Sequence, residues 1–290
     1  MKTPSASTSG SFEIGGDLSV HRLGYGTMRL VGDGAWGNPA DPAEAHRVLR
    51  RAVDLGVTLI DTADAYGPEI AERMIAEALH PYPAGLVIAT KGGITRQGPS
   101  KSEYVGRAGY LIQCVEMSLR RLKVERIDLY QLHRIDSRTP LEESLGALRL
   151  MREQGKIRHI GLSEVSQAQI EEAQRIVPIV SVQNRYSLAD RQHEATLSWC
   201  EERQIGFLPW YPMSAGKILK PDHPSAQGLA QIAKRLGASL PQILLAWLLH
   251  RSPVMLPIPG TSKVAHLEEN IAAAALKLTP QDRAEIEGAA

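Results

Sequence analysis

The sequence predicts an α/β protein built as a (β/α)8 TIM barrel with an N-terminal β-hairpin, and three observations lead to this fold class. Eight short apolar or β-branched runs alternate with amphipathic helical segments along the chain. The apolar runs do not alternate strictly with polar residues, which is typical of parallel strands covered by helices. The chain has 290 residues, of which 43% are hydrophobic, and eight units in about 250 residues fit one closed barrel.

The first expected element is the hairpin at residues 12–20, FEIGGDLSV. Its two short strands should turn at Gly15 and Gly16, because glycine tolerates the positive φ that tight turns require. Residues 1–10 are mostly small and polar, and we expect them to form a disordered leader. Residues 1–290 then make a single barrel domain.

The eight strand and helix units follow the hairpin in order. The expected strands cover residues 23–27, 57–62, 86–91, 127–133, 157–163, 179–187, 206–212 and 254–260. The helical segments that follow them cover residues 43–56, 69–79, 108–122, 141–155, 167–176, 192–204, 227–249 and 265–275. A doubly wound open sheet is the rival architecture, but it binds dinucleotides at a GxGxxG turn, whereas Gly24-Tyr25-Gly26 continues into TMRL.

Composition narrows the classes of function. Lys and Arg number 33 against 32 Asp and Glu, so the net charge of +1 provides no long-range field to favour nucleic acid or an anionic membrane. Cys114 and Cys200 lie far apart, and the nine histidines form no HExxH pattern, so we expect reduced thiols and metal-free chemistry. The longest apolar run, residues 243–249, is too short to span a bilayer. These features favour a cytoplasmic protein, a monomer or a weak homo-oligomer.

Polar and aromatic residues lie where the expected strands end. In a barrel these ends meet at one face, where the reactive residues are found. The strand ends supply Asp61, Lys91, His133, Ser163, Glu164, Gln183, Asn184, Trp210, Gly260 and Thr261. A ring of such residues indicates a binding site at this face.

Four of the residues at this face form a chemical group: Asp61, Tyr66, Lys91 and His133. A phenol has a reference pKa of about 10, and a nearby ammonium such as Lys91 lowers it by favouring phenolate. Asp61 would pair with Lys91, and His133 would donate a hydrogen bond to a carbonyl oxygen. Each residue also has a structural interpretation, as a cap, a loop charge, rim packing or a satisfied histidine. Asp64, in the same DTADAYG stretch, is expected to be a loop residue or a cap for the next helix.

The order and spacing of the motifs resemble the aldo-keto reductases, with the closest likeness to bacterial pyridoxal-reductase-like members. The likeness covers about positions 20 to 287, in LGYGTM, DTADAYG, ATKGG, LYQLHRID, GKIRHIGLSEVS, SVQNRYS and LPIPGTSKVAHLEEN. The resemblance implies a (β/α)8 barrel and an NADPH-dependent oxidoreductase. It further implies that Tyr66 is the general acid, that Lys91 and Asp61 tune it, and that His133 orients the carbonyl.

The resemblance also implies residues for the cofactor, NADPH or NADP. Ser163, Glu164 and Gln183 match positions that hold the carboxamide, and Trp210 matches the aromatic on which the nicotinamide stacks. Glu164 departs from the asparagine common in the family, and an ionised carboxylate only accepts hydrogen bonds. The structural alternative for Trp210 is packing at the barrel rim.

The adenine end is expected in GTSKVAHLEEN, where backbone N–H groups at a helix N-terminus suit a phosphate. The resemblance assigns Gly260 to this loop, Thr261, Ser262 and Lys263 to the 2′-phosphate, and Glu269 and Asn270 to adenine. The same residues also suit a capped helix start. Gly216 and Lys217 are expected over the pyrophosphate, and Met28 and Trp36 are expected in the substrate wall.

The favoured function is therefore NADPH-dependent reduction of a small aldehyde or ketone to an alcohol, with Tyr66 as the acid. Pyridoxal is one candidate substrate, suggested by the resemblance. An alternative from another class is a nucleotide-binding regulatory subunit that resembles the potassium-channel β subunits, which share the barrel and turn over slowly. Turnover with a panel of aldehydes separates the two.

Overall fold

The computed structural model describes residues 3–213 and 225–289, and it begins with an ordered segment. Residues Ala6–Ser9 form a 3-10 helix, η1, in which Ala6 is fully buried and donates its N–H to Leu55 O at 2.8 Å. The expectation of a disordered leader over residues 1–10 is therefore wrong for residues 6–10. The physical reason is that Ala6 and Ser9 are buried against the rest of the chain, where they form hydrogen bonds with buried backbone groups.

The N-terminal hairpin is confirmed. Strands β1 (Ser11–Ile14) and β2 (Leu18–His21) pair antiparallel, and both turn glycines have positive φ, 66° at Gly15 and 82° at Gly16. Asp17 in the turn accepts hydrogen bonds from Arg158 at 2.7 Å and from His159 at 2.6 Å. These contacts hold the hairpin against the first residues of the barrel strand at 157–163. The hairpin therefore lies at the amino ends of the barrel strands, opposite their carboxyl ends.

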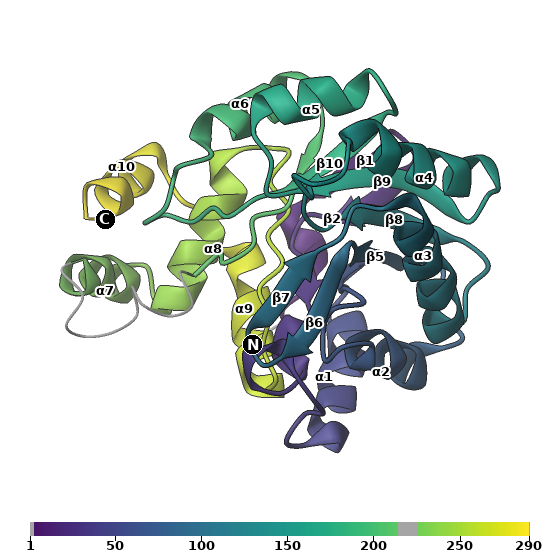
Figure 1. Ribbon diagram of the computed structural model, residues 1–290. Helices are drawn as coiled ribbons and strands as arrows, with labels where there is room; N and C mark the ends of the chain where they lie inside the picture. The colour runs from purple at the N-terminus through teal and green to yellow at the C-terminus, as the bar shows by residue number, and fades with distance from the viewer. Residues whose placement is uncertain (1–2, 214–224, 290) are drawn as a thin grey trace.

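The barrel is a curled parallel sheet of seven strands (Figure 1). The strand order is β11-β10-β9-β8-β5-β4-β3, and every pairing in it is parallel. The strands are β3 (Tyr25–Gly26), β4 (Leu59–Asp61), β5 (Val87–Gly92), β8 (Ile127–Leu132), β9 (Ile157–Ser163), β10 (Ile179–Gln183) and β11 (Gly206–Phe207). The predicted fold class is confirmed.

Residues 254–259 occupy the place of the eighth strand and close the barrel. Phe207 donates its N–H to Val254 O at 2.8 Å, and Gly24 donates to Pro257 O at 2.9 Å, so the segment bonds to both edge strands. The expected regular strand over residues 254–260 is nevertheless wrong, because only the bridge between Phe207 and Met255 is formed. Pro257 and Pro259 lack the N–H that a regular ladder needs.

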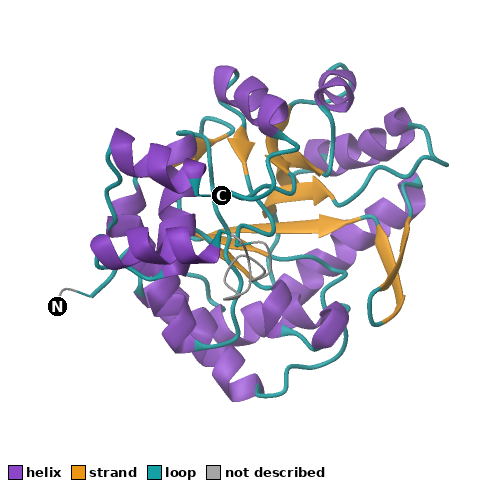
Figure 2. Cartoon of the chain, turned by 90° about the vertical axis from the view of Figure 1, so that its left-hand side faces the viewer, coloured by secondary structure: helices purple, strands orange, loops and turns teal. Residues whose placement is uncertain are grey.

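Helices surround the sheet on its outer side (Figure 2). They are α1 (Pro42–Asp54), α2 (Ile70–Leu79), α3 (Ala108–Leu122), α4 (Leu141–Glu153), α5 (Gln167–Gln174), α6 (Glu194–Glu202), α7 (Ala226–Arg235), α8 (Leu240–Arg251), α9 (Val264–Ala272) and α10 (Pro280–Gly288). Short 3-10 turns η2 (Met28–Leu30) and η3 (Asp33–Ala35) lie between β3 and α1, and η5 (Ala273–Ala275) follows α9. A second hairpin, β6 (Ile94–Gly98) and β7 (Lys101–Tyr104), was not expected from the sequence.

The helical region expected over residues 227–249 is two helices, α7 and α8, bent by 85°. Gly237 adopts φ 62° at the break, where the chain leaves the helix. Ser239 then starts α8 with a capping box to Gln242, and Pro241 occupies the first turn. Within the described ranges, no single helix has the length and apolar character needed to cross a membrane. The bent pair of α7 and α8 reaches that length and apolar character only when the two helices are taken together.

The first prediction concerns the buried N-terminal segment. Ser9 Oγ accepts the Leu23 N–H at 3.0 Å and donates to Ala6 O at 2.6 Å, and both contacts are buried. Ser9→Ala leaves a buried N–H without its acceptor, so we expect a loss of about 1–3 kcal/mol in the free energy of unfolding. Ser7→Ala is the matched control, because Ser7 is exposed and its hydroxyl contacts only the neighbouring Ser5. Urea unfolding measures both, and equal stability of the two variants would contradict the prediction.

Candidate active site

The carboxyl ends of the barrel strands surround a cavity of about 700 Å³. Most residues predicted at this face line it, and they come from different strands and loops. The lining residues include Gly26, Met28, Asp61, Tyr66, His133, Ser163, Gln183, Trp210, Gly260, Thr261 and Ser262. The structure therefore brings the four residues of the chemical group to one end of the barrel.

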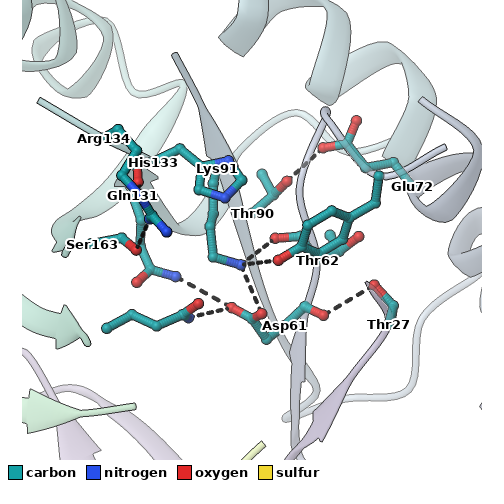
Figure 3. A network of polar contacts seen from close by, with 12 residues as sticks. Thr27, Asp61, Thr62, Glu72, Thr90, Lys91, Gln131, His133, Arg134 and Ser163 are labelled. Atoms are coloured by element: carbon teal, nitrogen blue, oxygen red, sulfur yellow. Dashed lines mark hydrogen bonds and ion pairs between the residues drawn. The ribbon is translucent and has the colours of Figure 1, made fainter. Parts of the chain in front are cut away.

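A buried ion pair lies beneath this cavity (Figure 3). Lys91 Nζ donates to Asp61 Oδ2 at 2.7 Å and to Thr62 O at 2.8 Å, and the two charged residues are 0% and 2% exposed. Asp61 Oδ1 also accepts from the Gln183 amide at 2.8 Å and from the Gln131 amide at 3.4 Å. Burial disfavours the ammonium and is the largest single effect, but the charges and hydrogen bonds of Asp61 and Tyr66 together outweigh it, so the pKa of Lys91 is raised. Lys91 therefore stays charged.

The Tyr66 hydroxyl lies next to this ammonium. The distance from Lys91 Nζ to Tyr66 Oη is 3.4 Å, and the Tyr66 side chain is almost fully buried. Burial raises the pKa of Tyr66, and the opposing effect of Lys91 is smaller, so the net direction is upward. The expectation of a lowered pKa is therefore wrong in this structure, because the expected cation effect is present but desolvation outweighs it.

The His133 ring completes the group. Its centroid lies 6.0 Å from the Tyr66 ring centroid at an interplanar angle of 81°. Burial lowers the pKa of His133 well below its usual value, and the charges of Lys91, Arg134 and Arg96 lower it further. The ring is therefore neutral near pH 7, a state in which one nitrogen donates and the other accepts. Nδ1 is buried and has no hydrogen-bond partner among the described residues.

Glu164 points to protein groups rather than into the cavity. Its Oε1 accepts the Trp210 Nε1–H at 2.5 Å and the Arg185 N–H at 2.7 Å, and it is absent from the cavity lining formed by the described residues. Its backbone adopts φ 57°, a conformation that asparagine reaches more easily. Glu164 Oε1 therefore supports the Trp210 ring, which does line the cavity, while the contact of Glu164 with a carboxamide stays a prediction.

The other end of the cavity is formed by the loop after the closing segment. Gly260, Thr261 and Ser262 line it, and Thr261 O accepts the buried Tyr25 hydroxyl at 2.6 Å. A Cβ at Gly260 would lie 2.8 Å from Gly26 O and 3.3 Å from Arg29 Cγ. A side chain at this position would therefore crowd the chain, so the loop requires glycine.

Six predicted site residues are absent from the cavity lining formed by the described residues: Trp36, Lys91, Glu164, Lys263, Glu269 and Asn270. The backbone of Trp36 instead forms an isolated parallel β-bridge with Gly67. The Asn270 side chain is buried, at 3% exposure. The predicted residues Gly216 and Lys217 lie outside the described residues.

Sequence reasoning missed three residues near the site. Arg134 and Gln131 flank His133 on and beside β8, and alternation along LYQLHRID is the signal that would place Gln131 on the same side as His133. Glu44 accepts the Val264 N–H at 3.1 Å, so the start of α9 already holds one carboxylate. No pattern in the sequence links Glu44 to residue 264.

Comparison with known proteins decides the family. The profile of the aldo/keto reductase family matches residues 22–290. The chain belongs to the aldo/keto reductase family. Pyridoxine 4-dehydrogenase of Escherichia coli is 40% identical to it over 287 residues, covering 97% of this chain and 98% of that relative.

A second relative and a solved structure are also similar to this chain over most of its length. An uncharacterized oxidoreductase of Schizosaccharomyces pombe is 48% identical over 276 residues, covering 95% of this chain and 88% of that protein. The crystal structure of an aldo/keto reductase from Klebsiella pneumoniae in complex with NADP and acetate has a TM-score of 0.82 and 26% identity. It covers 96% of this chain, and this chain covers 94% of it.

A second buried polar cluster lies next to the group of Asp61, Tyr66, Lys91 and His133 in this barrel. Glu72 accepts hydrogen bonds from Arg121 Nε and from Thr90 Oγ1, both at 2.6 Å. Burial and the charge of Glu72 raise the pKa of Asp64 to about 7, against smaller opposing effects. One of these opposing effects is the hydrogen bond that the Cys114 thiol donates to the Asp64 carboxyl. The Asp64 side chain does not cap α2, since Glu69 takes the N-cap position. The expectation of a capping role is wrong because this carboxyl is buried.

The raised pKa of Asp64 predicts a pH-dependent stability. Between about pH 4 and pH 7 the folded chain keeps a proton that the unfolded chain has lost, so the free energy of unfolding falls as the pH rises. Asp64→Asn removes this dependence, and its stability relative to the wild type should therefore improve by about 2 kcal/mol from pH 5 to pH 7.

Urea unfolding at several pH values measures this effect. The matched control is Asp54→Asn, which changes an exposed carboxyl at the end of α1. A stability difference between Asp64→Asn and the wild type that is constant across this range would show that Asp64 is ionised in the folded protein at pH 5.

Proposed function

We propose that the protein is an NADPH-dependent reductase that converts the carbonyl group of a small aldehyde or ketone to an alcohol. The observation that carries the proposal is the contact of the buried Lys91 ammonium with both Asp61 and the Tyr66 hydroxyl, at the wall of the cavity. Burial raises the pKa of Tyr66, but the ammonium opposes this effect and stabilises the phenolate that remains once the proton has left.

The chain's own residues supply the proton and the orientation. Tyr66 Oη transfers its proton to the carbonyl oxygen as negative charge develops there, and Lys91 stabilises the resulting phenolate. Neutral His133 donates from its cavity-side nitrogen to the same oxygen and fixes its position between the two rings. NADPH, when bound, supplies the hydride that reduces the carbonyl carbon. One hydride and one proton together balance the conversion of a carbonyl to an alcohol.

The cavity suits a nicotinamide nucleotide in shape and in donor groups. Ser163 and Gln183 would hold the carboxamide, and Trp210 would support the ring with its indole fixed by Glu164. Gly260 brings the loop backbone close enough for Thr261 and Ser262 to hold the nucleotide end. The complex of the Klebsiella pneumoniae relative with NADP supports a nicotinamide nucleotide as the cofactor.

Pyridoxal is a candidate substrate within this proposal. The support is the 40% identity to pyridoxine 4-dehydrogenase over almost the whole of both chains. That enzyme's name describes the oxidation of an alcohol, and the same site chemistry run in reverse reduces the aldehyde. The panel of aldehydes that tests the function therefore includes pyridoxal.

The test of the function is steady-state oxidation of NADPH with neutral and charged aldehydes. Turnover above the rate in buffer is the expected result. Tight binding of NADPH with no turnover on any of them would overturn the reductase and favour a nucleotide-binding regulatory role.

Tyr66→Phe tests the acid. Removal of the hydroxyl should lower kcat by roughly 10²- to 10⁴-fold, because Tyr66 has the only hydroxyl among the described residues that contacts Lys91 and could donate a proton into the cavity. The dissociation constant for NADPH, measured by tryptophan fluorescence, should stay unchanged. Tyr82→Phe is the matched control, since its hydroxyl donates to Leu122 O away from the cavity. Reduction by Tyr66→Phe at the wild-type rate would show that the proton comes from elsewhere.

Lys263→Ala tests the nucleotide end. Lys263 is exposed beside Ser262, and its ammonium is suited to a 2′-phosphate, which NADPH has and NADH lacks. We expect the dissociation constant for NADPH to rise by roughly tenfold, with little change for NADH. Lys277→Ala serves as a control on a different part of the surface. Equal losses for NADPH and NADH would remove the 2′-phosphate role of Lys263.

A further inference from the structure

Arg134 lies on the cavity wall, directly after His133 in the chain. Its Nη1 donates to Ser163 Oγ at 2.9 Å and to His133 O at 2.6 Å (Figure 3). Its guanidinium carbon is 6.0 Å from the centroid of the Trp210 ring. The guanidinium is therefore fixed beside the place where the proposed function puts the carbonyl group.

Only one nitrogen of this guanidinium donates hydrogen bonds to groups in the described part of the chain. Both of its hydrogen bonds start from Nη1, whereas Nη2 and Nε donate to none of the described residues. Arginine offers five N–H donors in a rigid planar fork. Arg134 thus keeps donors available at the cavity wall after its position has been fixed by Ser163 and His133.

The charges that line the cavity are unbalanced near this site. The charged lining residues are Arg29, Asp61, Arg96 and Arg134. The only carboxylate among these described residues is Asp61, and Lys91 already neutralises it. Arg29 lies beside Gly260, at the nucleotide end, so two guanidinium groups remain near His133, where both lower the pKa of that ring.

Neither of these two arginines has an acidic partner in residues 3–213 and 225–289. Arg96 Nη2 donates to Gly34 O and Ala35 O, which are neutral acceptors. On the Trp210 side, Glu164 uses its Oε1 to accept from Trp210 Nε1 and from the Arg185 N–H. A partly buried cation without a counter-ion is unfavourable by itself and gains from an anionic ligand.

We propose that Arg134 is a specificity-determining residue that binds an anionic oxygen of the substrate, a carboxylate or a phenolate, with Arg96 adding to the positive field. The preferred substrates are then aldehydes or ketones that carry such a group, and neutral carbonyl compounds are poorer substrates. This inference rests on the proposed function for the location of the carbonyl. The anion site itself depends only on the guanidinium groups and the cavity.

The rival interpretation is that Arg134 only orients Ser163. In that case its loss would weaken the handling of every substrate and of the cofactor to a similar degree. An anion-binding role instead changes the ratio between charged and neutral substrates. The ratio is therefore the measurement that separates the two interpretations.

The experiment compares kcat/KM for benzaldehyde and for 2-, 3- and 4-carboxybenzaldehyde at saturating NADPH. In the wild type, we expect the best carboxylated isomer to exceed benzaldehyde by roughly tenfold or more, the effect of one charge-assisted hydrogen bond. Arg134→Gln should remove this preference, and Arg134→Lys should keep part of it. Arg29→Gln is the matched cavity arginine: it should raise the KM for NADPH and leave the ratio unchanged.

A binding measurement keeps this inference separate from the proposed function. Benzoate and benzamide have similar shapes, and their binding in the presence of NADP is followed by tryptophan fluorescence. Tighter binding of benzoate that Arg134→Gln abolishes supports the anion site even where no aldehyde is reduced, a result that would overturn only the reductase. Equal treatment of charged and neutral compounds by the wild type, in both assays, would overturn the anion site while leaving the reductase intact.

Discussion

The buried pair of Lys91 and Asp61 is the interaction around which the candidate site is arranged. Moving two charges out of water costs several kcal/mol per ion unless their remaining donors and acceptors are satisfied, and removal of one partner from such a pair typically costs about 3–5 kcal/mol. Here Thr62 O takes a second ammonium hydrogen, and the amides of Gln183 and Gln131 donate to the carboxylate. The pair is thus compensated by groups from three barrel strands or their ends.

The parallel barrel makes this compensation possible. Asp61 ends β4, Lys91 lies on β5, Gln131 lies on β8 and Gln183 ends β10, although they are far apart in sequence. Because all these strands point the same way, their last inward side chains reach the same level inside the barrel. Tyr66 is different, since it lies on the loop after β4 and approaches Lys91 from above the strand ends.

Strand ends and motif order made most of the site predictable from sequence, whereas contacts between distant segments did not. Apolar runs ending in Asp61, Lys91 and His133 place those residues at one face whatever the exact boundaries are. The break between α7 and α8 and the irregular segment 254–259 depend on glycine and proline positions inside otherwise periodic runs. The support of Trp210 by Glu164 needs tertiary structure, because neither residue signals the other in sequence.

The direction of the Tyr66 pKa shows why geometry alone does not decide an electrostatic question. Proximity to Lys91 favours phenolate, but Lys91 is largely neutralised by Asp61, and desolvation of the buried ring then dominates. The positive charge that is not neutralised lies instead on Arg134 and Arg96, and it adds to burial and the charge of Lys91 in lowering the pKa of His133. An anionic substrate would compensate these guanidinium groups without disturbing the Lys91 pair. In the proposed function, the charge of Lys91 therefore serves proton transfer, and the charges of Arg134 and Arg96 serve recognition of the substrate.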